Sequence, residues 1–371
     1  MFRKTLKKIT EHPHTFFIGA LFIAIELSMA LTMLSAYVRG AEQKIAGQDA
    51  ASIIGATMRS CYENGRQPGC YARAAHDFIQ RFSLREIMTV FAGNEKRSDF
   101  FSDCHLTAHF LGREAYKKMG SVRSVFAQSS YACLGGTLHG AVEGYFMSKG
   151  LLGLSDTAYA KEIPFVCGNQ NEYRVPQQFI ECNHGMGHAA MFLGENDLIR
   201  ALKLCDALKS TQERELCYSG ALMVNADSAN DQDHPSVYAP KPQDPLYPCP
   251  LLDKHYQELC YTYGVLGPFQ SNLAQSISTC KLIPQKYRNG CFQTIGRDRT
   301  MISADPIALK KQCDQITETD FRGECMKGIA YNLVIRFGPN SALPEKFCNV
   351  LDHEAKNDCT LQEKSARYWQ R

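Results

Sequence analysis

Three short segments of the chain place side chains that commonly bind transition metals four residues apart. Each segment opens on a cysteine and carries one pair of such side chains: Cys104 with His105 and His109, Cys133 with His139 and Glu143, and Cys182 with His184 and His188. On an α-helix, residues four apart lie one above the other on the same face, so each pair is arranged for chelation. All three pairs fall within residues 103–191, which the sequence therefore predicts to be a His-rich site region.

Some of these side chains recur in phase when residues are counted from the cysteine of each segment. His139 and His188 both lie at plus six, whereas His105 and His109 are one position out of step but flank the same face. Neighbouring packed helices run about 8 to 10 Å apart, so ligands from two or three helices can meet on one ion. Imidazoles with a carboxylate suit zinc, iron or copper better than calcium or magnesium. We predict a mononuclear or dinuclear site with these members: His105, His109, His139, His184 and His188 as metal ligands, and Glu143 and Glu114 as catalytic carboxylates.

The residue types leave the chemistry of such a site open. In a hydrolytic mechanism, a metal ion lowers the pKa of a bound water while a carboxylate takes its proton, and an oxidative mechanism at iron or copper is equally compatible. Two other hypotheses compete with an enzyme: a non-catalytic scaffold for another envelope protein, in which the histidines are structural, and a protein that binds haem non-covalently. No Cys-x-x-Cys-His motif is present, so covalent c-type haem is not expected.

The cysteines predict a framework of disulfides in an oxidising compartment. There are 16 of them, and all lie beyond residue 60. Their spacing suggests seven local pairs: Cys61 with Cys70, Cys167 with Cys182, Cys205 with Cys217, Cys249 with Cys260, Cys280 with Cys291, Cys313 with Cys325, and Cys348 with Cys359. Cys104 and Cys133 remain, either bonded to each other or present as thiolates that join the metal.

The fold class follows from the period of these pairs. The second members Cys260, Cys291, Cys325 and Cys359 recur after 31, 34 and 34 residues, a period typical of stacked helical hairpins. A glycine often stands three residues after the second cysteine, which predicts that the second helices form a tightly packed inner row. We therefore expect an all-α fold of disulfide-stapled helical-hairpin repeats, either an α-solenoid or an α/α toroid, over residues 61–371.

Two of the motifs resemble those of a known family. The stretches His139-Gly-Ala-Val-Glu-Gly144 and Cys182-Asn-His-Gly-Met-Gly are similar to the His-Gly-x-x-Gly and Cys-His-Gly motifs of lanthionine synthetase cyclases, which are zinc-bearing α/α toroids. The similarity covers about a dozen residues, and Asn183 interrupts the second motif. It implies that paired helices of this kind can close into a toroid, and no activity is transferred from it. The hairpin period also resembles tetratricopeptide-type repeats.

The N-terminal segment predicts attachment to a membrane. A basic tail (residues 1–14) precedes a nearly uninterrupted apolar run (15–38) that is long enough to cross a bilayer as a signal anchor. The excess of basic residues before this run places the N-terminus in the cytoplasm and the remainder in the periplasm or outside the cell. The alternative is a signal peptide cleaved near Ala36 or Gly40.

The remaining stretches complete the predicted organisation. Residues 39–60 suggest a helical stalk, and the Pro- and Asp-rich residues 227–248 an inserted loop. The net charge of +3 and the lack of a basic stripe with interleaved aromatics exclude nucleic acid as an expected partner.

Overall fold

The computed structural model describes residues 50–94, 98–130, 132–150, 155–228, 235–269 and 272–370. The chain divides into two compact units, Met1–Ala56 and Thr57–Arg371, and the candidate site belongs to the second. The predicted basic tail and membrane anchor, residues 1–14 and 15–38, lie outside the described ranges. Within those ranges no helix combines the length and the apolar character needed to cross a membrane.

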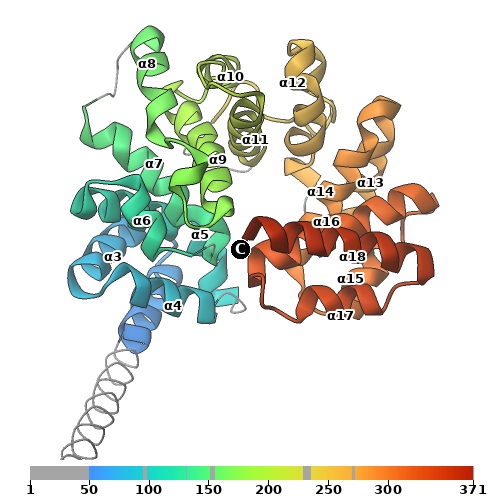
Figure 1. The fold of residues 1–371 in the computed structure, drawn as a ribbon, viewed down its shortest axis with the longest axis horizontal. Helices are drawn as coiled ribbons and strands as arrows, with labels where there is room; N and C mark the ends of the chain where they lie inside the picture. The colour runs from blue at the N-terminus through green and yellow to red at the C-terminus, as the bar shows by residue number, and fades with distance from the viewer. Residues whose placement is uncertain are drawn as a thin grey trace, which may run out of the picture. The chain divides into compact units, whose positions relative to one another are not determined.

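The described part of the chain is helical, as the sequence predicted (Figure 1). Residues 50–63 are helical, and the rest of the predicted stalk lies outside the described ranges. The longer helices that follow are α3 (Pro68–Arg81), α4 (Leu84–Asn94), α5 (Ser98–Met119), α6 (Val122–Gln128), α7 (Gly136–Ser148), α8 (Asp156–Val166), α9 (Pro176–Leu193), α10 (Leu198–Cys205), α11 (Thr211–Asp227), α12 (Lys254–Leu259), α13 (Leu273–Leu282), α14 (Arg288–Ile302), α15 (Pro306–Cys313), α16 (Thr319–Phe337), α17 (Leu343–Asn349) and α18 (His353–Gln370). Short 3₁₀ turns and one π-turn join them: η1 (Ala132–Gly135), η2 (Gln170–Glu172), η3 (Cys249–Leu251), η4 (Cys260–Gly264), η5 (Gly267–Phe269) and η6 (Gln285–Tyr287).

The predicted disulfides are present. All seven local pairs form, from Cys61–Cys70 to Cys348–Cys359, and Cys104 is bonded to Cys133. The alternative in which Cys104 and Cys133 remain thiolates at the metal is therefore wrong for this structure. The bonds indicate an oxidising, extracytoplasmic environment.

The second cysteine of a hairpin lies inside its helix. Cys182 lies six residues after the first residue of α9, and Cys217 lies six residues after that of α11, so an expectation that these helices begin on their cysteines is wrong. Local signals upstream set these starts. Pro176 occupies the first turn of α9, and Ser210 caps α11 in a reciprocal capping box with Glu213.

Glycines let particular helices approach one another closely. A Cβ atom added to Gly140 of α7 would overlap the backbone carbonyl of His109 on α5, and one added to Gly112 of α5 would overlap that of Thr137 on α7. Gly187 and Gly220 have the same relation between α9 and α11. The predicted tight packing of second helices is therefore present between these partners, and it holds the His-rich helices at short range.

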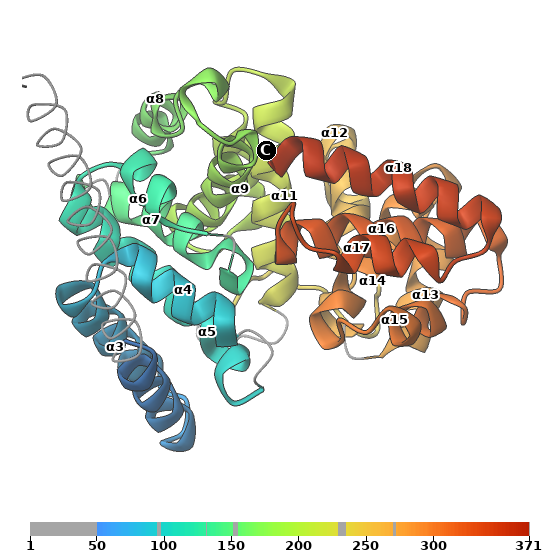
Figure 2. The same cartoon turned by 60° about the horizontal axis from the view of Figure 1, so that its bottom comes forward.

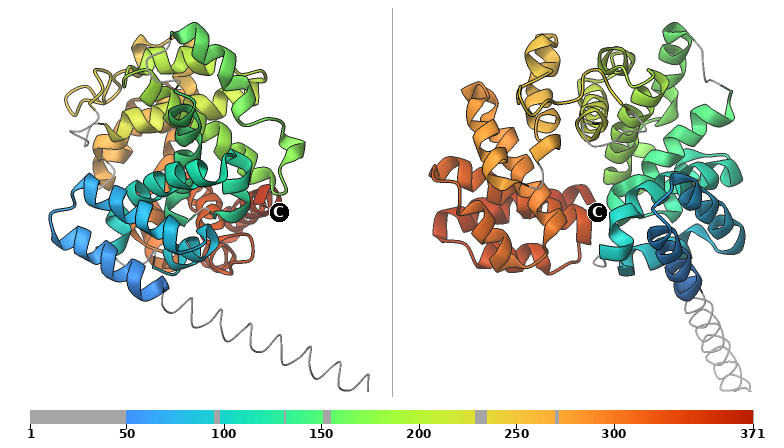
Figure 3. Two further views of the ribbon diagram at one scale, coloured as in Figure 1. Left: turned by 90° about the vertical axis from the view of Figure 1, so that its left-hand side faces the viewer. Right: turned by 180° about the vertical axis from the view of Figure 1, so that it is seen from behind.

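Helices follow one another in space in their order along the chain, and the chain then curls back (Figures 2 and 3). Helix α5 packs on α7, α7 on α9, α9 on α11, α14 on α16, and α16 on α18. Helix α18 in turn contacts α9. Residues from the end of α16 consequently share a cavity with residues from α6, α7 and the start of α9.

Candidate metal centre

Three neighbouring helices bring all five predicted histidines together. His105 and His109 come from α5, His139 from α7, and His184 and His188 from α9. Glycine again allows α7 and α9 to approach closely. Gly185 of α9 lies against the backbone of His139, and a Cβ atom added to Gly185 would be 3.1 Å from the Cα atom of His139.

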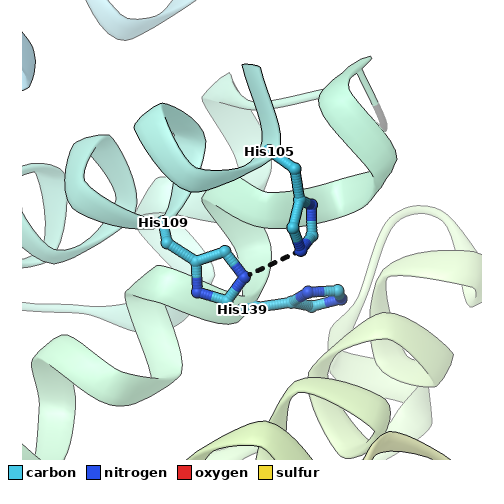
Figure 4. Close-up of side chains that lie close together, drawn as sticks. All are labelled: His105, His109 and His139. Atoms are coloured by element: carbon cyan, nitrogen blue, oxygen red, sulfur yellow. Dashed lines mark hydrogen bonds between the residues drawn. The ribbon is translucent and has the colours of Figure 1, made fainter. Parts of the chain in front are cut away.

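The imidazoles form two groups that share one member. The nitrogens of His105, His109 and His139 lie within 4.8 Å of one another (Figure 4), and so do those of His139, His184 and His188. The ring centroid of His139 is 5.5 Å from that of His109 and 4.2 Å from that of His188. Each group has a size and composition that could hold a metal ion.

Hydrogen bonds on the far side of three rings fix which nitrogen faces the cluster. The Nδ1 of His105 lies 2.9 Å from the carbonyl oxygen of Cys133, and that of His109 lies 2.9 Å from Oε1 of Glu143, so both Nδ1 atoms are donors. His184 follows the same pattern. Its Nδ1 is 2.9 Å from the Ser219 hydroxyl, which itself donates to the Leu216 carbonyl. A neutral histidine that donates through Nδ1 leaves Nε2 with a lone pair, the arrangement found in metal-ligating histidines.

On α5, these tautomers leave two lone pairs facing each other, since the Nε2 atoms of His105 and His109 are 3.1 Å apart. On α9, the Nε2 atoms of His184 and His188 are 3.2 Å apart, and a neutral His188 can donate to His184 at this distance. Two ligand nitrogens on a tetrahedral zinc ion, each at about 2.0–2.1 Å from the metal, are separated by about 3.3 Å. A cation between the His105 and His109 nitrogens would remove their repulsion, and the observed spacing fits that position.

His139 is the most unusual member of the cluster. It is 2% exposed, and neither of its ring nitrogens has a hydrogen-bond partner among the described residues. The closest carboxylate oxygen, Oε2 of Glu181, is 3.6 Å from Nε2, beyond hydrogen-bonding distance. A buried polar atom without a partner costs about 1–3 kcal/mol. Such a group in a native protein calls for an explanation, and a bound ion on each side of the ring supplies one.

Burial keeps four of the five histidines neutral, the state in which they bind metals. Desolvation lowers the pKa of His105 to about 4. Desolvation, with Arg297 nearby, lowers that of His184 to about 3. The pKa values of His139 and His188 are also shifted well below the ordinary range, first by burial and then by the neighbouring imidazoles. Metals compete with protons for imidazole nitrogens, so a low pKa favours the metal.

Glu143 is a charged group that orients the cluster. Burial alone would raise its pKa, but His109 and Arg113 outweigh burial and hold the pKa at about 2. The Arg113 Nε donates to Oε2 at 2.7 Å, while Oε1 accepts from His109. Both oxygens are therefore engaged, which makes Glu143 a positioning residue for His109 rather than an open base.

Glu114 is not brought to the cluster. Its carboxylate pairs with Nδ1 of His76 on α3, at 2.8 Å. Position 114 lies about 140° around the helix from His109, on the side of α5 that faces α3. The prediction of Glu114 as a catalytic carboxylate of the cluster is therefore corrected, because this residue pairs with His76 instead.

The structure adds groups that the sequence did not single out. Glu181 lies beside His139, and its pKa is raised to about 8 by burial against a smaller opposing effect of Gln177. Ser219 orients His184, and Arg297 lies near enough to influence it. Arg297 occupies the same phase in α14 as His139 in α7, six residues after its cysteine. The spacing of the repeat could therefore have identified Arg297 as a residue near the histidines.

The motif that resembles lanthionine synthetase cyclases does not supply a thiolate here, because Cys182 is bonded to Cys167. Comparison of the chain with models of protein families, with curated proteins and with solved structures found no match.

Proposed function

We propose that this protein is an extracytoplasmic, metal-dependent enzyme whose centre holds two transition-metal ions, zinc, iron or copper, on either side of His139. One ion would bind His105, His109 and His139, and the other His139, His184 and His188. The observation that carries the proposal is the shared imidazole of His139, which is buried and has no hydrogen-bond partner at either nitrogen among the described residues.

The proposal gives each surrounding residue a role. Cys133, Glu143 and Ser219 hold the Nδ1 atoms of three ligands, so that their Nε2 lone pairs converge. Ions in such a site supply Lewis acidity, or redox chemistry if they are iron or copper. Glu181 is the carboxylate closest to His139 that is not already engaged by a cation, so it is the group placed to exchange a proton with a reactant.

Two competing hypotheses fit the geometry less well. A non-catalytic scaffold would have structural histidines with hydrogen-bond partners at their separate helix interfaces, whereas these converge from three helices. A haem sandwiched between two histidines needs a flat slot between their nitrogens, and spacings of 3.1 and 3.2 Å leave no room for one.

We also propose that residues 15–38 anchor the protein in a membrane and that the helical hairpins form a curled α-solenoid. The first rests on the length and apolar character of the segment. The second is supported by the contacts of successive helices in chain order and by the return of α18 to α9.

The test is elemental analysis of the full chain, made in an oxidising compartment and purified without chelator or histidine tag. We expect two ions per chain in the wild type and one in each of two double variants, His105→Ala/His109→Ala and His184→Ala/His188→Ala. His139→Ala should weaken both positions. A wild type without metal, even after incubation with zinc and copper, would favour the scaffold hypothesis instead.

A further inference from the structure

A cavity of about 420 Å³ lies beside the cluster. Its size falls within the range of about 300–1,000 Å³ typical of small-molecule sites. Most of its wall is apolar and comes from five helices, α4, α6, α7, α9 and α16, and the segments next to them. The lining includes Phe126, Leu138, Gln177, Glu181, Ile335 and Phe337. Glu181, which lines the cavity, lies 3.6 Å from Nε2 of His139, so this wall borders the candidate metal centre.

One spot on the wall is polar and lacks a partner. Gln177 is 6% exposed and donates through Nε2 to Oε1 of Glu181, one turn further along α9. Its other amide atom, Oε1, is buried and has no hydrogen-bond partner among the described residues. Because Gln177 lines the cavity, this unpaired oxygen is available to accept a hydrogen bond from a hydroxyl or N–H group placed next to it.

Glu181 connects this polar spot to the histidines. One of its oxygens accepts from Gln177, and the other lies 3.6 Å from Nε2 of His139. Only the side chain of Glu181 would therefore separate a molecule bound by Gln177 from His139 and the proposed ions.

We propose that this cavity is the substrate site, and that the substrate is a small, largely apolar molecule with a hydroxyl or N–H group bound by Gln177. The apolar wall would contact the apolar part of the substrate, and the amide oxygen of Gln177 would orient the substrate's hydroxyl or N–H group towards Glu181 and His139. This inference rests on the proposed metal-dependent function, since it names the class of substrate for that centre.

The binding test uses two fluorescent probes of nearly equal shape, 2-naphthol and 2-methoxynaphthalene, of which only the first can donate a hydrogen bond. We expect the wild type to bind 2-naphthol about threefold to tenfold more tightly, as one hydrogen bond in a buried site allows. Gln177→Leu should bind both probes equally. Ala92→Trp, which places an indole at the cavity wall, should weaken both at least tenfold, whereas Ile307→Trp on exposed α15 should match the wild type.

Three results would overturn the inference. One is the absence of binding in the wild type, and another is unchanged binding in Ala92→Trp. The third is a preference for 2-naphthol that survives in Gln177→Leu.

A second measurement tests whether the cavity adjoins the metal. Bound 2-naphthol should lose most of its emission when the protein is loaded with paramagnetic copper, but not when it is loaded with zinc, because quenching by copper requires close approach. Equal emission in the two forms would refute the placement beside His139. Naphthol binding in a protein that takes up no metal would refute the proposed function while leaving the cavity as a binding site.

Discussion

Replacing His139 by leucine should make the metal-free protein more stable while weakening its metal binding at both positions. The imidazole is 2% exposed, and its two nitrogens lack hydrogen-bond partners among the described residues. Relief of one or two such penalties is worth about 1–3 kcal/mol each. A leucine of similar size costs less than about 1.5 kcal/mol in packing. The net expectation is a gain of about 1–3 kcal/mol in the free energy of unfolding.

Urea denaturation of the metal-free proteins, with disulfides intact, measures this gain. The midpoint for His139→Leu should lie above that of the wild type. Adding zinc should then reverse the order. A ligand at 100 times its dissociation constant stabilises the folded state by about 2.7 kcal/mol for each site, and the variant binds zinc much more weakly than the wild type does. His255→Leu is the matched control: this histidine is exposed and outside the cluster, so its effect should stay within about 0.5 kcal/mol.

The opposite result would refute the reasoning. If His139 is a structural residue, its replacement removes favourable contacts and lowers the midpoint in the metal-free protein, and zinc leaves the order of the two proteins unchanged. The experiment thus separates a ligand from a packing residue without any assay of activity.

Three further outcomes follow from the site and its frame. Glu143→Gln should lower metal affinity about tenfold to a hundredfold in a chelator competition without abolishing it, because the residue orients His109 from outside the metal's coordination sphere; complete loss would make Glu143 a ligand. Gly140→Ala should lower the free energy of unfolding by at least about 1–3 kcal/mol in the same urea assay and weaken metal binding, because the new methyl group would overlap the His109 carbonyl. Its control is Gly323→Ala, which has open space around it and should stabilise α16 by about 0.5–1 kcal/mol. The metal-free protein should also lose stability as the pH falls from 6.5 to 4. The pKa of His105 is lowered from 6.5 to about 4, so the unfolded state binds more protons in this window, and this difference costs about 3 kcal/mol for His105 alone. A urea midpoint that does not change with pH would contradict this expectation.

The sequence contained the disulfide framework and the five histidines because both follow a short-range spacing. Cysteines 11 to 15 residues apart pair across a hairpin turn, and side chains four apart share a helix face. The sequence could not show which carboxylates join the histidines, because that depends on how neighbouring helices are rotated. Glu114 turned towards α3 and His76, whereas Glu181, next to a predicted disulfide cysteine, turned towards His139. The return of α16 to α9, which closes the cavity, is likewise a long-range contact that no local pattern encodes.

The glycine contacts and disulfides around the histidines explain how the proposed ligands can be held together although the metal-free cluster is energetically unfavourable. Two buried and three half-buried imidazoles oppose close packing of α5, α7 and α9, both by desolvation and by the facing lone pairs of His105 and His109. Glycine contacts bring the backbones together. In addition, the Cys104–Cys133 bond closes a loop across 29 residues, which contributes about 3.5 kcal/mol in the chain-entropy model. The same bond holds the Cys133 carbonyl against Nδ1 of His105. Since covalent and packing interactions fix the ligands beforehand, little of the binding energy of a metal is spent on ordering them. The disulfides therefore help to position the proposed metal ligands as well as to stabilise the fold.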